Sequence, residues 1–229
     1  MIAAVVDNDI LIVGPVQVIK CLVGMLGTGE FYKTLGVSVL RITAGVLTGF
    51  LLGFFLAQVA RRFNIIEEFL QPLVACLKSI PVASFVILVL IWAGNSKLAY
   101  VISSLVSFPI SYLNILGGLK NTDAKLLEVG SVYKMSYMKQ MKYIYLPAII
   151  PQILTTLELT IGMGFKSGVA AEVIGQSLLS IGNEMYRAKI YLETDHLLAW
   201  TFMVIIVSKL VEILFKLIVK KSAERSGQI

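Results

Sequence analysis

The chain has 229 residues, of which 57% are hydrophobic and 15% charged, with a formal net charge of +6 and a mean hydropathy of +0.85. A hydrophobic share this far above that of soluble domains indicates an integral membrane protein. The basic residues stand at the ends of apolar runs, where membrane topology uses them, so the net charge does not indicate nucleic-acid binding.

Residues 1–33 are predicted to form an N-terminal segment on the outer surface of the membrane. Pro15, Lys20 and Gly27 interrupt an apolar run that is too short to cross a bilayer. The first residues also lack a basic stretch ahead of an apolar one, so they do not resemble a cleaved signal peptide.

The first membrane span is predicted within residues 34–60, where Arg41 is the only charged residue. Gly45, Gly49 and Gly53 recur in it every four residues, a spacing that lets another helix backbone approach closely. We therefore expect a helix-packing face. A pore-lining stripe is the alternative.

Four further apolar runs follow, and each is read as a membrane span. They cover residues 78–93, 98–119, 148–173 and 198–219. A tight turn is expected at Gly94–Ser96, and residues 174–197 form a loop or a re-entrant piece. The sequence thus predicts an all-α, polytopic transmembrane bundle of five spans over residues 34–219, with a polar cytoplasmic tail at 220–229.

Basic residues distribute unequally across this five-span arrangement, with eleven on one side and five on the other. The richer side holds Arg61, Arg62, Lys78, Lys120, Lys125, Lys134, Lys139, Lys142, Lys220, Lys221 and Arg225. The other side holds Lys20, Lys33, Lys97, Arg187 and Lys189. Because cytoplasmic loops carry the excess of Lys and Arg, we expect the N-terminus outside and the C-terminus in the cytoplasm.

A polar, basic loop at residues 120–147 separates two of the spans. Asn121, Thr122 and Asp123 are good N-cap residues ahead of an amphipathic run. Helix formers are lacking near Lys134, after which apolar residues resume at helical spacing. The loop is therefore predicted to form two short helices joined by a turn, outside the lipid.

The same loop resembles the cytoplasmic loop of binding-protein-dependent ABC transporter permeases. Their signature is Glu-Ala-Ala, a Gly four residues after the last Ala, and Ile-x-Leu-Pro ten residues beyond that Gly. Glu128, Ile144, Leu146 and Pro147 stand at the matching positions. The resemblance implies that this loop is the docking and coupling element for the transporter's ATPase.

Three positions of the loop depart from that signature: Val129 and Gly130 replace the two alanines, and Lys134 replaces the glycine. A glycine in such a turn often supplies a positive φ, which lysine adopts only at a cost. The presence of lysine at this position therefore affects the geometry of the turn most directly.

The resemblance extends along nearly the whole chain and is greatest to the subfamily named for nitrate, sulfonate and bicarbonate uptake. Matching stretches include LKSIPVASFVILVLIWAG in the second predicted span, AEVIG at 171–175 and the pair Thr194-Asp195. Family members usually have one more N-terminal helix. Either this chain starts internally, or that helix is absent.

Membership of this family would imply a type I ABC importer permease of the bacterial inner membrane. Its partners would be a separate ATPase subunit that uses ATP, an outside substrate-binding protein and a second permease subunit, as a homodimer. The substrate would be a small anion such as a sulfonate or nitrate. An ATP-independent carrier and a membrane scaffold remain the alternatives, in which the loop is an ordinary connector.

Charges within the predicted spans mark candidate pathway residues, because each costs about 2.5–3.5 kcal/mol on insertion. Lys166 and Glu172 are the candidates, and a lysine near mid-span could attract an anionic substrate. The alternative for Lys166 is pairing with an acid or snorkelling along a groove. Glu212 and Lys216 stand four residues apart in the last span, where they can pair with each other.

No catalytic, metal or cofactor site is predicted. Cys21 and Cys76 are far apart and belong to no CxxC motif, and His196, the only histidine, has no second base or nucleophile beside it. The stretch GMGFKSG at 162–168 lacks the glycine that a phosphate-binding loop places directly before its lysine. ATP is therefore expected to bind a partner and not this chain.

Overall fold

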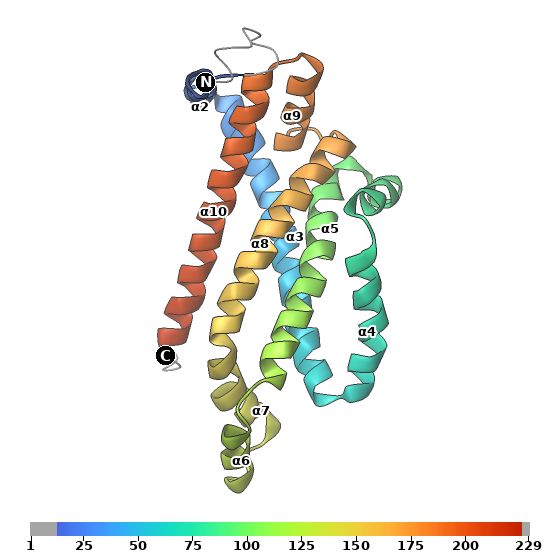
Figure 1. Ribbon diagram of the computed structural model, residues 1–229, viewed down its shortest axis with the longest axis vertical. Coiled ribbons are helices and arrows are strands. Elements are labelled where there is room, and N and C mark those ends of the chain that lie inside the picture. The colour runs from blue at the N-terminus through green and yellow to red at the C-terminus, as the bar shows by residue number, and fades with distance from the viewer. Residues whose placement is uncertain (1–12, 226–229) are drawn as a thin grey trace. The chain divides into compact units, whose positions relative to one another are not determined.

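A computed structural model describes residues 13–225, and within that range the chain is helical with short connections and no strand. The all-α prediction is confirmed. Figure 1 shows the elements in chain order. They are α2 (Pro15–Leu26), α3 (Gly29–Arg62), α4 (Asn64–Ser79), α5 (Val82–Lys120), α6 (Ala124–Val132), α7 (Tyr137–Gln140), the π-helical turn η1 (Met141–Tyr145), α8 (Leu146–Gly175), α9 (Ile181–Ile190) and α10 (Thr194–Arg225).

Three of the described helical runs are long and apolar enough to cross a membrane: α3, α5 and the run Tyr137–Gly175 that ends with α8. Helix α10 has 32 residues and coincides with the last predicted span. Charged residues in its second half, among them Lys209 and Glu212, reduce its hydropathy. The predicted segments 34–60, 98–119, 148–173 and 198–219 each fall inside one of these helices.

The second predicted span, residues 78–93, is wrong in its boundaries. The structure has a helix at 64–79, and residues 82–93 form the part of α5 before Gly94. Ile80 between them is extended (φ −74°, ψ 129°), as the residue before Pro81 tends to be. Gly94 has φ 69°, so the expected turn is a bend at this one residue.

Pro72 stands in the stretch before the second predicted span and lies inside α4. A proline within a helix costs about 3 kcal/mol. Leu70 and Val74, which flank it, are only 7% and 2% exposed and belong to a hydrophobic cluster. Burial of such side chains contributes about 1.5–3 kcal/mol each, which is enough to offset the proline.

The described chain divides into two compact units, and each contains parts of the same long helices. Among the described residues, unit 1 comprises 13–45, 81–103 and 164–209, and unit 2 comprises 46–80, 104–163 and 210–225. Of the predicted segment 1–33, residues 13–33 belong to unit 1, and the first twelve residues lie outside the described range. Each unit has its own core.

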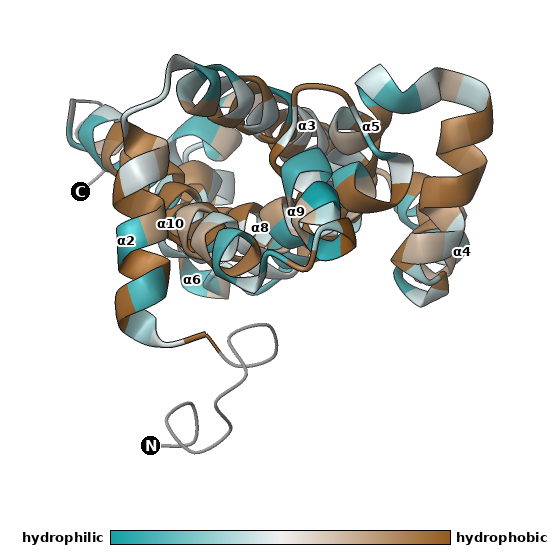
Figure 2. Cartoon of the chain, turned by 90° about the horizontal axis from the view of Figure 1, so that it is seen from above, coloured by the Kyte–Doolittle hydropathy of each residue, from teal (hydrophilic) through white to brown (hydrophobic). Residues whose placement is uncertain are grey.

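The core of unit 1 includes side chains that are at most 1% exposed, contributed by α3, α5, α8, α9 and α10. They include Ile42, Leu98, Ile102, Phe165 and Ile181. Helix α2 has polar and apolar residues in alternation along its surface in Figure 2. Val18 is its one buried residue in the described structure. Helix α2 is therefore attached to unit 1 by little apolar contact.

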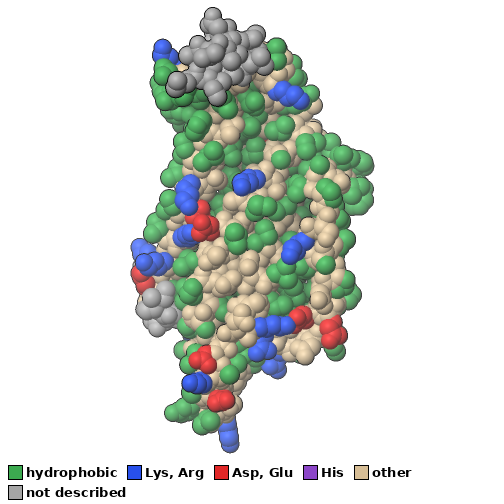
Figure 3. All heavy atoms as spheres, in the orientation of Figure 1, with side chains coloured by type: hydrophobic (Ala, Val, Ile, Leu, Met, Phe, Trp, Pro, Cys, Tyr) green, Lys and Arg blue, Asp and Glu red, His purple; other side chains and the backbone are tan. Residues whose placement is uncertain are grey.

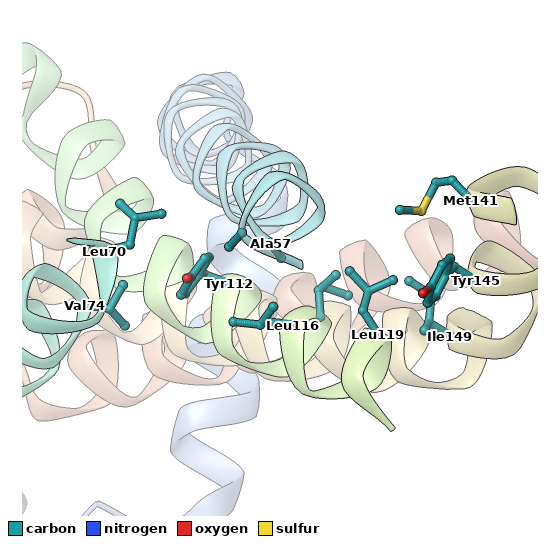
Figure 4. Packing of buried hydrophobic residues seen from close by; sticks show 11 residues of the cluster. Ala57, Leu70, Val74, Tyr112, Leu116, Leu119, Met141, Tyr145 and Ile149 are labelled. Atoms are coloured by element: carbon teal, nitrogen blue, oxygen red, sulfur yellow. The ribbon is translucent and has the colours of Figure 1, made fainter. Parts of the chain in front are cut away.

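The core of unit 2 forms where the end of α5 meets α3, α4, η1 and the beginning of α8 (Figure 4). Tyr112, Leu116 and Leu119 of α5 pack with Ala57 of α3 and Tyr145 of η1, among others. Helix α4 joins the same cluster through Leu70 and Val74. The cluster fixes the positions of α3, α4, α5 and the loop within this unit.

Helix α4 runs antiparallel to the end of α5 in unit 2. Lys120, the last residue of α5, pairs with Glu67 in the first turn of α4, with Nζ and Oε1 2.5 Å apart. Lys78 is at the opposite end of α4, in the last turn of that helix. Lys78 was expected on the same side as Arg61, and this placement separates the two along the length of α4.

Three of the five glycines of α3, those predicted to form a packing face, meet α5 at backbone distance. In unit 1, a Cβ on Gly45 would collide with the carbonyl oxygen of Tyr100. In unit 2, a Cβ on Gly49 would lie 2.9 Å from Ser107 Cβ, and one on Gly53 would lie 2.7 Å from Phe108 O. Small residues at this spacing permit close helix packing, as expected for a membrane bundle.

Figure 3 shows hydrophobic side chains over much of the face in view. Helix α10 illustrates the pattern, since many of its apolar side chains are about half exposed. They include Phe202, Ile205, Leu210, Leu214 and Leu217. Surfaces of this kind suit a hydrocarbon environment, which requires no polar covering.

Candidate functional site

The loop between α5 and α8 folds into α6, α7 and η1, all within unit 2. Asp123 precedes α6, and its carboxylate accepts a hydrogen bond of 2.9 Å from the backbone N–H of Lys125. This is the N-cap expected from the sequence. Ser131 Oγ donates to the carbonyl of Glu128 at 2.7 Å in the last part of the same helix.

Helix α6 ends in a Schellman motif, in which two backbone N–H groups beyond the helix return to its last carbonyls. The N–H of Met135 donates to Gly130 O, and the N–H of Lys134 donates to Ser131 O, both at 2.9 Å. Lys134 has φ 48°. The turn therefore keeps the left-handed conformation that a glycine often supplies, and a lysine adopts it here.

The small residue at position 130 allows α6 to pack on η1. Gly130 is buried, and a Cβ there would lie 2.8 Å from Ile144 Cδ1 and 3.4 Å from Gln140 Cγ. Gln140 is itself fixed by a hydrogen bond from its side-chain amide to Met135 O at 3.1 Å. Gly130, which replaces an alanine of the signature, and Ile144, which matches it, are therefore packed together across the turn.

The end of the signature begins helix α8. Leu146 and Pro147 are its first two residues, where a proline is tolerated because the first N–H groups of a helix have no intrahelical partner. Tyr145, just before them, is 5% exposed in the hydrophobic cluster of unit 2. The loop thus enters α8 at a fixed point, as the sequence predicted.

Two arginines at the end of α3 hold the loop in place. Arg61 donates from Nη2 to the hydroxyl of Tyr145 at 3.3 Å and from Nε to Leu119 O at 3.5 Å. The guanidinium of Arg62 lies 4.5 Å from the ring centre of Tyr137. The Tyr137 hydroxyl donates to Gln58 O at 3.1 Å. A guanidinium at this distance over an aromatic ring contributes roughly 0.5–1 kcal/mol or more.

Sequence reasoning assigned Arg61 and Arg62 to membrane topology alone and did not connect them with Tyr137 and Tyr145. These contacts join residues far apart in the chain. The available signal was a pair of tyrosines eight positions apart in a basic loop that follows two adjacent arginines. That pattern alone does not identify a pairing.

The loop presents an exposed face that combines apolar side chains with one carboxylate. Val132, Tyr133 and Met138 are 76–78% exposed, Val129 is 51% exposed, and Glu128 is exposed on the same short helix. Exposed apolar groups concentrated on a polar loop are characteristic of a protein-binding surface. The contacts of Arg61 with Tyr145 and of Arg62 with Tyr137 keep this face in a defined orientation within unit 2.

Glu172, a candidate pathway residue, is fully buried in unit 1 at the N-terminus of α9. Both of its carboxylate oxygens lie 2.9 Å from Ser38 Oγ, and Oε2 accepts a bond of 3.2 Å from the N–H of Gly182. Ser38 Oγ also accepts the N–H of Ile181 at 2.8 Å. Helix N-termini favour such an anion, so this carboxylate holds α9 to α3 and α8.

Lys166, the other pathway candidate, is exposed on α8 in unit 1 and does not join Glu172 in one cluster. Lys216 of α10 pairs within unit 2, with Nζ 2.6 Å from Glu158 Oε2 and 2.9 Å from Glu212 Oε1. The predicted pairing of Glu212 with Lys216 is confirmed. Glu158 extends the pair to α8.

Comparison with known families identifies this arrangement. The family described as binding-protein-dependent transport system inner membrane component matches residues 49–224. This range includes the loop with its signature and four of the long helices in whole or in part.

Individual relatives are similar over most of their length. The putative aliphatic sulfonates transport permease protein SsuC of Bacillus subtilis is 27% identical over 209 residues, which are 90% of this chain and 75% of the relative. The taurine transport system permease protein TauC of Escherichia coli is 23% identical over 223 residues, 94% of this chain and 80% of the relative. The bicarbonate transport system permease protein CmpB of Synechococcus elongatus is 27% identical over 161 residues, which are 69% of this chain and 57% of the relative.

A solved structure shares the fold. It is described as the crystal structure of an amino acid ABC transporter with histidines, and it matches with a TM-score of 0.64 and 17% identity. The match covers 89% of this chain and 98% of that one.

Proposed function

We propose that this chain, which belongs to the binding-protein-dependent transport system inner membrane components and is thus a permease subunit of an ABC transporter, carries a small anion inward. The relatives named for aliphatic sulfonates, taurine and bicarbonate support an anionic solute. ATP would be bound and hydrolysed by a separate ATPase, and an outside binding protein would deliver the solute. This chain would pair with a second copy of itself to complete the pathway.

The coupling role is assigned to the face of α6 that exposes Glu128 with Val129 and Val132. This face is apolar enough to dock on a protein and carries one carboxylate among lysines, so a partner with a complementary cation would recognise it. Arg61 and Arg62 attach the loop to α3, so a force on the loop acts on a membrane-spanning helix. This attachment is the observation that carries the proposal.

Reversal of the charge at Glu128 tests it. Glu128→Lys should leave the permease in the membrane but weaken its co-purification with the ATPase subunit and uncouple ATP hydrolysis from uptake. Glu224→Lys makes the same charge change at an exposed position near the end of α10 and should behave like the wild type. Unchanged association and transport in the Glu128 variant would favour an ATP-independent carrier or a scaffold.

We propose that the loop and the C-terminus face the cytoplasm. Counting Lys78 on the outer side, where the antiparallel α4 would carry it, changes eleven basic residues against five into ten against six. The excess still favours this orientation. A cysteine at Ser131 should react with a membrane-impermeant reagent only from the cytoplasm, and reaction from outside would reverse the assignment.

Lys166 is proposed to attract the anion along the pathway. Its exposed ammonium on α8 is free to face a water-filled space in the assembled transporter, where lysine binds oxyanions as a point charge. Lys166→Met should abolish uptake while ATPase association remains normal. Wild-type uptake in that variant would exclude this role, and reduced assembly would indicate a structural lysine.

A further inference from the structure

An open cavity of about 630 Å³ in unit 1 is bordered by α2, the beginning of α3, α9 and the beginning of α10. Its lining combines aromatic side chains, such as Phe31 and Trp200, with charged side chains, among them Lys20 and Glu184. Phe31 and Trp200 stack with their ring centres 5.0 Å apart and so form one wall. The transport role described above assigns nothing to this cavity.

Three potential metal ligands meet in its lining. The Sγ of Cys21, a ring nitrogen of His196 and a carboxylate oxygen of Asp195 all lie within 4.8 Å of one another, and each side chain is partly buried. Met25 lies next to them, with Sδ 3.9 Å from Cys21 Sγ. A thiol, an imidazole and a carboxylate are the three side-chain types that bind zinc in proteins.

We propose that Cys21, Asp195 and His196 bind a divalent transition-metal ion of the zinc type, with water as the fourth ligand. Zinc binds sulfur at about 2.3 Å and nitrogen or oxygen at about 2.0–2.2 Å, so ligand atoms on one tetrahedral ion lie about 3.5 Å apart. Side-chain rotation therefore needs to close the three groups by roughly 1 Å. Three protein ligands with an open fourth position form a recognised class of zinc site.

The side-chain types of Cys21, Asp195 and His196 favour a transition-metal ion over Mg²⁺ and Ca²⁺. A thiolate and an imidazole are poor ligands for Mg²⁺ and Ca²⁺, which take oxygen.

The hydrogen bonding and protonation of the ligands also bear on metal binding. One oxygen of Asp195 accepts a hydrogen bond of 2.9 Å from the backbone N–H of His196, which orients the carboxylate at the start of α10. Burial, together with the charges of Asp195 and Glu193, raises the pKa of the Cys21 thiol to about 11. An arriving ion would displace this proton.

Occupancy of the site would change how α2 is attached. Cys21 belongs to α2, whereas Asp195 and His196 belong to the first turn of α10. In the described structure α2 buries a single side chain, Val18, so a metal bridge would add a strong link to a weakly held helix. A bound metal ion would thus cross-link α2 and α10 within unit 1.

Cobalt titration of the intact, purified permease provides the first test, because Co²⁺ substitutes for Zn²⁺ and has a thiolate charge-transfer band. We expect one Co²⁺ per chain with that band, lost when Zn²⁺ is added. Loss of a residue that only hydrogen-bonds to a metal ligand lowers metal affinity about 10–100-fold. Because His196 is proposed to be a ligand itself, His196→Gln should lower the affinity for Co²⁺ by at least about 100-fold. Cys21→Ser should remove the band, and Cys76→Ser, at the exposed second cysteine, should keep it.

A second measurement leaves all three ligands intact. In the Cys76→Ser chain, Zn²⁺ should slow maleimide labelling of Cys21 by about tenfold or more, and a chelator should reverse the effect. An unchanged labelling rate would overturn the proposal. So would a cobalt band that survives Cys21→Ser, or one that depends on Cys76.

Discussion

Close packing of α3 on α5 can be tested at Gly49 in unit 2. A Cβ at this position would collide with Ser104 O and would lie 2.9 Å from Ser107 Cβ and 3.0 Å from Phe108 N. Two of these three atoms belong to the α5 backbone and cannot rotate away. Gly49→Ala must therefore push the two helices apart.

The magnitude follows from these distances. Non-bonded carbon atoms prefer about 3.5–4.0 Å, so the helices must separate by about 1 Å. Overpacking of this kind costs about 1–3 kcal/mol. The separation would also stretch the bond of 2.8 Å from Ser111 Oγ to Phe50 O beyond hydrogen-bond range. Such a bond contributes about 0.6 kcal/mol in a membrane bundle, so the two losses sum to roughly 2–4 kcal/mol. The better helix propensity of alanine offsets up to about 1 kcal/mol of this, which leaves a net loss of roughly 1–3 kcal/mol.

Gly36→Ala is the matched control. It makes the same chemical change on the same helix, but a Cβ at Gly36 would meet nothing within 4 Å beyond the adjacent residues and backbone of its own helix. Replacing a glycine in a helix with alanine gains up to about 1 kcal/mol. Denaturant unfolding of the purified variants in detergent should show Gly49→Ala less stable than the wild type and Gly36→Ala at least as stable. Equal stability of the two variants would refute the packing argument.

Two further substitutions probe the loop and α9. Lys134→Gly should stabilise the loop by about 0.5–1 kcal/mol, because a left-handed residue with a side chain costs about 1–2 kcal/mol and the greater freedom of an unfolded glycine offsets part of the gain. Slower limited proteolysis in the loop would register it, and faster cleavage would contradict it. Ser38→Ala should cost about 2–5 kcal/mol, since Glu172 and the N–H of Ile181 would each lose a buried partner. Ser208→Ala, which removes only a local bond to Ile205 O, should cost far less, and equal losses in thermal stability would show that Ser38 has no special role.

Local signals account for what the sequence could predict about the loop. The cap at Asp123, the break near Lys134 and the helix start at Pro147 each depend on residues within a few positions of one another. Such preferences are physical properties of short segments and survive in the folded chain. The left-handed conformation of Lys134 shows this clearly, because it follows from the turn and not from the residue that occupies it.

Segment boundaries failed where tertiary packing outweighed a local signal. Pro72 is a strong helix breaker, yet burial of Leu70 and Val74 keeps α4 continuous through it. Pro81 obeys the local rule because Ile80 before it is free to extend. A single sequence does not distinguish the two prolines, since the difference lies in what their neighbours contact.

Candidate charges were equally ambiguous before the fold was known. Glu172 and Lys166 both stand in one predicted span, but the structure buries the first against Ser38 and Gly182 and leaves the second exposed. The meeting of Cys21 with His196 was invisible for the same reason. Their spacing in the chain matches no metal motif, and only folding brings them together.

The attachment of the loop to α3 explains how docking could produce a movement inside the membrane. Arg61 and Arg62 belong to the last turn of α3, while Gly49 and Gly53 of the same helix lie at backbone distance from α5. Interfaces packed this closely do not deform gradually, because a shift of about 1 Å already meets backbone atoms. A displacement of the loop is therefore not absorbed at the contact of α3 with α5 in unit 2. It must move α3 and α5 together, so under the proposed coupling role the glycine contacts are as necessary as the loop itself.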